Sequence, residues 1–148
     1  MATLDIRPLG DTDRPAWEPL WAGYLTFYGA SLAPEVTDTT WARLMDPAEP
    51  MHALGCFDGE RLVGIVHYIF HRSTWTTGNY CYLQDLFTAE AARGRGAGRA
   101  LIAAVYERAR EAGASRVHWL TQETNTTARA LYDQVADRPG FIQYRKIL

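Results

Sequence analysis

The segment Arg93–Arg99, Arg-Gly-Arg-Gly-Ala-Gly-Arg, has the composition of an anion-binding turn. Glycine at every second position permits positive φ and lets the main chain approach a ligand closely. We expect a helix to begin at Ala97, and the free N–H groups of its first turn would point back into the glycines, with the positive end of the helix dipole behind them. Such a helix start suits a pyrophosphate. The same composition also fits a flexible, solubilising loop.

Two common phosphate-binding patterns do not match this turn. No Gly-Lys-Ser or Gly-Lys-Thr follows the glycines, as a Walker A loop requires, and Arg99 stands where a dinucleotide-binding fingerprint needs its last glycine. A nucleotide-binding domain of another kind stays open as an alternative.

Hydrophobic patterning predicts the elements that must position this turn. Strands are expected at 3–8, 51–57, 62–70, 79–87, 116–121 and 141–147, and helices at 13–28, 36–45, 97–112 and 125–136. Pro19 suggests that the first helix becomes regular only near that residue, and Asn125 is a suitable N-cap for the last. The order β-α-α-β-β-β-α-β-α-β predicts one mixed α/β domain over residues 1–148.

Composition excludes several classes of protein. The 15 lysines and arginines against 17 acidic residues give a net charge of -2, so nucleic acid is not an expected partner. No apolar run approaches the roughly 18 residues of a membrane span, and no membrane partner is expected. Cys56 and Cys81 lie in strand-like runs, which favours buried thiols in the cytoplasm. His52, His67 and His71 lack metal-ligand spacing, so we predict no metal site.

Two longer strings resemble motifs of the GCN5-related N-acetyltransferase (GNAT) family. Residues 82–102, YLQDLFTAEAARGRGAGRALI, resemble its acetyl-CoA-binding motif. Residues 119–141, WLTQETNTTARALYDQVADRPGF, resemble its second motif, Asn-x-x-Ala-x-x-x-Tyr followed by Gly-Phe. Both are most similar to the branch that contains the diamine acetyltransferases and the yeast histone/polyamine acetyltransferases. The predicted order of elements agrees with the GNAT fold.

The resemblance implies a site. The sheet would be mostly antiparallel and splayed between strands 79–87 and 116–121, where the pantetheine arm of acetyl-CoA enters. One backbone N–H would polarise the thioester carbonyl, and Tyr132 would protonate the leaving thiolate. The implied cofactor-binding residues are Leu86, Phe87, Thr88, Arg93, Gly94, Arg95, Gly96, Ala97, Gly98, Arg99 and Asn125. The resemblance also implies a homodimer formed through terminal strands.

Acetyl transfer to an amine requires a neutral nucleophile, although at pH 7 only about one lysine-like amine in 2,500 is neutral. The related diamine acetyltransferases carry a glutamate general base where this chain has Gln84, which cannot accept a proton. Asp85 would face the opposite side of a regular strand. A water, His118 or Glu123 is left as the route for the proton, and the base is unassigned.

The acceptor is expected to be the primary amine of a small molecule, polyamine- or amino-acid-like. Aromatic residues within 17–41 would form either its pocket or the core, and the sequence does not decide between these places for Trp21, Tyr24, Tyr28 and Trp41. Two alternatives stay open: a protein lysine or N-terminal acetyltransferase, and a CoA-binding regulatory module without catalysis.

Overall fold

The structure is a computed structural model that describes residues 3–148. The strands are β1 Leu4–Pro8, β2 Met51–Asp58, β3 Arg61–Arg72, β4 Asn79–Thr88 and β5 Val117–His118. The helices are α1 Arg14–Phe27, α2 Pro34–Met45, α3 Ala97–Glu111 and α4 Thr126–Val135, with short 3-10 helices η1 Asp11–Asp13 and η2 Glu90–Ala92. The predicted mixed α/β fold and its order of elements are confirmed as far as α4.

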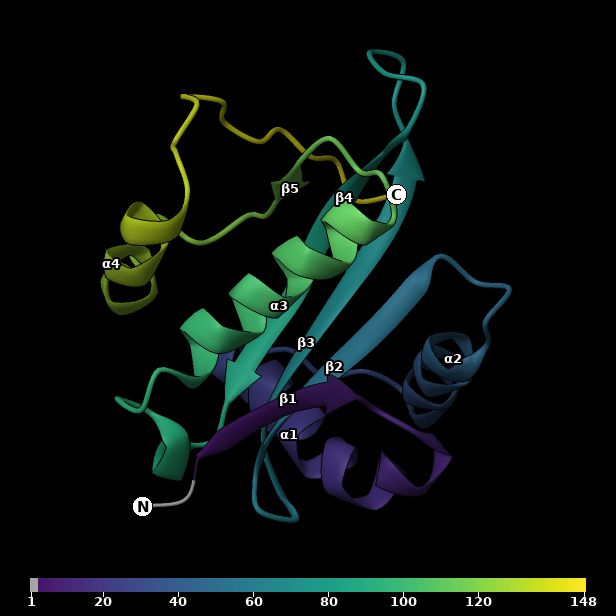
Figure 1. The fold of residues 1–148 in the computed structure, drawn as a ribbon, viewed down its shortest axis with the longest axis vertical. Coiled ribbons are helices and arrows are strands. Elements are labelled where there is room, and N and C mark those ends of the chain that lie inside the picture. The colour runs from purple at the N-terminus through teal and green to yellow at the C-terminus, as the bar shows by residue number, and fades with distance from the viewer. Residues whose placement is uncertain (1–2) are drawn as a thin grey trace.

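One sheet with the strand order β1-β2-β3-β4-β5 organises the molecule. The first four strands pair antiparallel in sequence order, whereas β5 lies parallel to β4. That last pairing joins only Cys81 to Val117 and Tyr82 to His118, so the two strands separate beyond Tyr82. The predicted splay between them is therefore present, and α3 and α4 lie beside it (Figure 1).

Helix α3 covers one face of the sheet because its apolar residues recur every three or four positions. Leu101, Ile102 and Val105 are fully buried on this face, and Ala109 is nearly so. They pack with β2, β3 and β4, and α4 adds partly buried residues at the edge of the cluster. This core fixes the start of α3, and therefore the glycine-rich turn, against the end of β4.

Helices α1 and α2 cover the opposite face with a cluster rich in tryptophan. Trp17 is fully buried and packs on Trp21 and Trp41, with ring centroids 5.8 Å and 4.9 Å away. Trp21 and Trp41 therefore belong to the core. Helix α1 begins at Arg14 and accommodates Pro19 inside it, so the prediction that Pro19 delays the helix is wrong.

The predicted strand at 141–147 is absent from the described chain, where these residues form neither helix nor strand. Alternating apolar residues suggested a strand, yet Phe141 and Tyr144 are 88% and 89% exposed. A strand needs a neighbouring strand edge to satisfy its backbone groups. This C-terminal tail (residues 136–148) instead returns from α4 toward the upper end of β4 (Figure 1).

Candidate active site

The glycine-rich turn has the backbone conformation that its composition predicts. Gly94 and Gly96 have φ of 77° and 82°, the left-handed region that glycine adopts without strain. Gly96 directly precedes α3, and its carbonyl accepts the first helical hydrogen bond from the Ala100 N–H at 2.9 Å. Gly98 faces α4, because a Cβ added there would lie 3.4 Å from Leu131 Cδ2.

A cavity of about 520 Å³, here called the cofactor cavity, opens at the start of α3. Of the predicted cofactor-binding residues, Leu86, Phe87, Thr88, Arg93, Gly94, Gly96, Ala97, Gly98, Arg99 and Asn125 line it. Tyr132 lines it as well, whereas Arg95 does not. The Arg95 guanidinium instead pairs with Asp58 at 2.8 Å. Phe27 and Tyr28, at the end of α1, line it too, although sequence reasoning assigned the aromatic residues of 17–41 to the acceptor pocket or the core.

The splay of the sheet leaves backbone N–H groups of β4 facing this cavity. Successive N–H groups of a strand point to alternate sides. The Ala89 N–H donates to the Val63 carbonyl of β3 at 2.7 Å, so the N–H groups of Thr88 and Leu86 point away from β3. Both residues line the cofactor cavity, beyond the last pairing of β4 with β5. Two donors are thus available to the carbonyl groups of a bound ligand.

Gly96→Ala provides a test of the turn. Holding a Cβ-bearing residue at a φ of 82° costs about 1–2 kcal/mol. We expect the variant to fold, with its unfolding free energy lowered by about this amount, and to bind CoA about tenfold more weakly, because relaxation of the turn would misdirect its N–H groups. Calorimetric titration with CoA measures the effect, and unchanged affinity would contradict it. Gly113→Ala is the matched control, since its φ is 76° and it follows the opposite end of α3, outside the lining of both cavities.

Tyr132 lies on α4 with its phenol at the cofactor cavity. Its ring packs edge-on against Trp119, with centroids 5.3 Å apart. Burial raises the pKa of the Tyr132 phenol above 10, and the nearby Tyr28 adds to the shift. The group is therefore protonated at neutral pH and able to donate. Asn125 precedes α4 as predicted, but its side chain makes no capping hydrogen bond.

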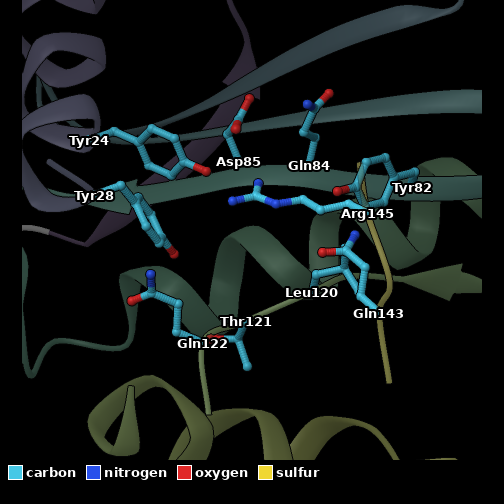
Figure 2. Close-up of a pocket in the computed structure, with 10 residues that line it drawn as sticks. All are labelled: Tyr24, Tyr28, Tyr82, Gln84, Asp85, Leu120, Thr121, Gln122, Gln143 and Arg145. Atoms are coloured by element: carbon cyan, nitrogen blue, oxygen red, sulfur yellow. The ribbon is translucent and has the colours of Figure 1, made fainter. Parts of the chain in front are cut away.

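A second cavity of about 410 Å³, here called the acceptor cavity, lies between α1, β4, the segment after β5 and the C-terminal tail (Figure 2). The residues that line it are Tyr24, Tyr28, Tyr82, Gln84, Asp85, Leu120, Thr121, Gln122, Gln143 and Arg145. Tyr28 lines both cavities, so they meet at this side chain. Tyr24 and Tyr28, whose places the sequence did not decide, are pocket residues.

A β-bulge brings both Gln84 and Asp85 to the acceptor cavity. Asp85 pairs with His67 and Leu83 with Tyr68, so Gln84 is the extra residue on β4. A bulge breaks the alternation of side chains between the two faces of a sheet. The expectation that Asp85 faces away from Gln84 assumed a regular strand and is therefore wrong. Figure 2 shows both side chains at the same cavity.

Asp85 is held by a buried hydrogen-bond chain. The Trp17 indole N–H donates to His67 Nε2 at 2.9 Å, and His67 Nδ1 lies 2.9 Å from Asp85 Oδ2. Because Nε2 accepts, the proton of the imidazole is on Nδ1 and is donated to the carboxylate. His67 is 3% exposed, so this bond is shielded from water. The chain orients Asp85 from behind, while its side chain lines the cavity.

Three phenols surround this carboxylate. Burial raises the pKa of Tyr24, Tyr28 and Tyr82, and in each case the negative charge of Asp85 raises it further. All three are therefore neutral hydroxyl donors near pH 7. The Thr121 hydroxyl oxygen is buried on the cavity wall without a hydrogen-bond partner among the described residues. The cavity thus offers several donors to a polar ligand.

The other proposed proton acceptors lie outside this cavity. His118 Nε2 is 3.1 Å from His71 Nε2, and the His118 ring stacks on Tyr82, with centroids 5.2 Å apart. Burial, with Arg116 and His71 nearby, lowers the pKa of His118. Glu123 lines neither cavity. Gln143 and Arg145 line the acceptor cavity without having been predicted, because no local pattern indicated where the tail would lie.

Two absences apply to the described part of the chain. No group of three or more histidine, cysteine or acidic residues within 3–148 is placed to hold a metal ion. In the same range, no helix has the length and apolarity needed to cross a membrane.

Comparison with known proteins shows the class of protein to which this fold and site belong. The sequence model of the Acetyltransferase (GNAT) family matches residues 15–136. The chain is 36% identical over 143 residues to D-amino-acid N-acetyltransferase HPA3 of Saccharomyces cerevisiae, covering 95% of this chain and 89% of that protein. It is 34% identical over 85 residues to thialysine N-epsilon-acetyltransferase of Caenorhabditis elegans, covering 57% of this chain and 52% of that protein.

Solved structures agree in fold. A ribosomal-protein-alanine N-acetyltransferase from Brucella melitensis biovar Abortus 2308 superposes with a TM-score of 0.84 at 23% identity, over 99% of this chain and 100% of that one. AAC(6')-Iy in complex with a CoA bisubstrate analogue has a TM-score of 0.84 at 17% identity, over 99% of this chain and 100% of that one.

The chain belongs to the GNAT family of acetyltransferases. It is an N-acetyltransferase, and its cosubstrate is acetyl-CoA, which this family uses. The predicted family and cofactor are thereby confirmed. The cofactor cavity suits that molecule, because its lining includes a helix start suited to a pyrophosphate and β4 residues whose N–H groups point away from β3.

Proposed function

We propose that this enzyme transfers the acetyl group of acetyl-CoA to the primary amine of a small molecule, polyamine- or amino-acid-like, by direct attack in a ternary complex. The observation that carries the proposal is the meeting of the two cavities at Tyr28. Their linings allow both substrates to be bound at once, with the thioester at the junction. Because both reactants are then held side by side, the transfer step becomes effectively unimolecular.

In this mechanism the turn 93–99 and the start of α3 bind the pyrophosphate. Leu86 and Thr88 present N–H groups toward the pantetheine arm, and one of them stabilises the oxyanion that forms when the amine attacks the thioester carbon. Such a donor contributes about 3 kcal/mol to transition-state stabilisation. When the carbon–sulfur bond breaks, Tyr132 gives its proton to the thiolate. Asn125 contacts the cofactor near Tyr132.

The amine must lose a proton, and Asp85 is the best-placed acceptor. Among the described residues that line the acceptor cavity, Asp85 alone carries a carboxylate. Its hydrogen bond from His67 fixes one oxygen and leaves the side chain directed at the cavity. Gln84 supports the reaction by hydrogen bonding with its amide, since it has no basic group. The proton passes from the ammonium to Asp85, directly or through a water.

Release of free CoA from acetyl-CoA across a panel of amines tests the function. We expect release that depends on the amine, with one N-acetylated product per CoA. Initial-velocity plots should intersect, because both substrates must be bound before transfer. Parallel plots with a covalent acetyl-enzyme would contradict direct attack. Tight acetyl-CoA binding without amine-dependent release would favour the regulatory module, and efficient acetylation of peptides alone would favour a protein acetyltransferase.

We also propose that the enzyme acts in the cytoplasm. Cys56 and Cys81 are both free and buried, and burial raises the pKa of the Cys81 thiol to about 11. Two unpaired thiols suit a reducing compartment. Expression of a tagged chain, followed by fractionation, tests the location; recovery with an exported fraction would contradict it.

A homodimer formed through the C-terminal tail is a further part of the proposal. Gln143 and Arg145 line the acceptor cavity, while Ile142 and Tyr144, which alternate with them along the tail, are 76% and 89% exposed. Exposed apolar side chains that lie close together in the sequence favour burial against a partner. Light scattering after size exclusion should give twice the chain mass, and Ile142→Asp combined with Tyr144→Asp should halve it. A monomer in the unaltered protein would contradict the dimer.

A further inference from the structure

We infer that the acceptor carries a carboxylate as well as an amine, and that Arg145 of the C-terminal tail binds that carboxylate. The inference rests on the proposed function and narrows its substrate class to amino acids, away from polyamines. Among the described residues that line the acceptor cavity, only Asp85 and Arg145 are charged, and their signs are opposite.

The two charges do not neutralise each other. Within residues 3–148, the Asp85 carboxylate accepts a hydrogen bond from His67 Nδ1, and no hydrogen bond or salt bridge engages the Arg145 guanidinium. Figure 2 shows the Arg145 side chain reaching from the tail into the cavity toward Tyr24 and Tyr28. A guanidinium directed into a ligand cavity is suited to a carboxylate, which it can hold through two parallel hydrogen bonds.

A polyamine fits this arrangement poorly. Its second ammonium group would meet Arg145, and like charges brought together in a partly enclosed site repel. An amino acid has the complementary pattern: the ammonium group lies near Asp85 and the carboxylate near Arg145. The neutral phenol of Tyr28 and the Thr121 hydroxyl, which has no hydrogen-bond partner among the described residues, add donors whose hydrogen bonds an anionic ligand can accept.

The placement of Arg145 on the tail makes it a residue that determines specificity. The tail is exposed from Asp137 to Leu148 and is not part of the described sheet. Removal of the Arg145 guanidinium therefore leaves the hydrophobic clusters on both faces of the sheet intact. Arg145 does not line the cofactor cavity, so acetyl-CoA binding should not depend on it.

The experiment compares amino acids with their methyl esters, which keep the amine and lose the anion. The variants are Arg145→Gln and Lys146→Gln; both remove one positive charge from the tail, and Lys146 does not line the cavity. The ratio of kcat/KM for the acid to kcat/KM for the ester is measured in each enzyme. The lower amine pKa of the ester affects every enzyme alike and cancels when ratios are compared.

We expect Arg145→Gln to lower this ratio by about 10- to 100-fold, as for loss of a charged hydrogen bond. Lys146→Gln should leave it within about twofold of the parent value. A ratio that Arg145→Gln does not change, or diamines used better than amino acids, would overturn the inference while the proposed function stands. No acetylation of any amine, esters included, would overturn the proposed function and the inference with it.

Discussion

Tyr132→Phe should lower kcat about 100-fold and leave the KM for acetyl-CoA within about twofold, because general acid catalysis contributes at least this factor. The phenol is protonated at neutral pH, since burial raises its pKa. Phenylalanine preserves the packing on Trp119 but has no proton to give to the departing thiolate. Release of free CoA in the presence of a saturating amine measures the change.

Tyr106→Phe is the matched control. The Tyr106 hydroxyl donates to the Val135 carbonyl at 2.8 Å, so it joins α3 to α4 without lining either cavity. Loss of this bond should cost about 1 kcal/mol of unfolding free energy and change kcat less than twofold. Equal effects of the two substitutions on kcat would mean that Tyr132 acts through packing of α4, and the acid role would be abandoned.

Asp85→Asn should lower kcat/KM for the amine at pH 7 by about 100- to 1,000-fold. Without an acceptor for the ammonium proton, the enzyme must wait for the neutral amine, which for a lysine-like group is about one molecule in 2,500. The ratio of kcat/KM in the parent enzyme to kcat/KM in Asp85→Asn should fall about tenfold for each unit that the pH rises, until the pH reaches the pKa of the amine. The reason is that a growing fraction of the amine is already deprotonated in solution. Rates between pH 6.5 and 9.5 measure this recovery.

Asp133→Asn supplies the control for Asp85, because Asp133 is an exposed carboxylate on α4 that lines neither cavity. Its pH profile should coincide with that of the parent enzyme. If Asp85→Asn lowered kcat/KM by the same factor at every pH, through KM alone, Asp85 would only bind the ammonium group. Another group would then have to take the proton.

The features that depend on local sequence could be predicted. Positive φ at Gly94 and Gly96 followed from alternating glycines, and the buried stripe on α3 followed from helical spacing. The resemblance of Asn-x-x-Ala-x-x-x-Tyr to a family motif indicated Asn125 and Tyr132, and both line the cofactor cavity. The conformation of the turn and the buried stripe could be predicted because each depends on residues within one or two turns of the chain.

The features that depend on distant pairing could not be predicted. The bulge at Gln84 arises from the register between β3 and β4, so nothing in the β4 sequence alone directs Asp85 into the cavity. The tail alternates apolar and polar residues as a strand would, yet Gln143 and Arg145 lie at the acceptor cavity instead. Its position is set by where α4 ends and by the gap between β4 and β5.

A crystal structure with a bisubstrate analogue, an amino acid joined through its amine and an acetyl linker to CoA, tests the two-cavity site most directly. We predict the pyrophosphate on the turn 93–99, the linker at the junction beside Tyr28, and the amino-acid carboxylate against Arg145. An analogue that binds with its amino-acid half outside the acceptor cavity, or with its pantetheine arm outside the gap between β4 and β5, would contradict the account.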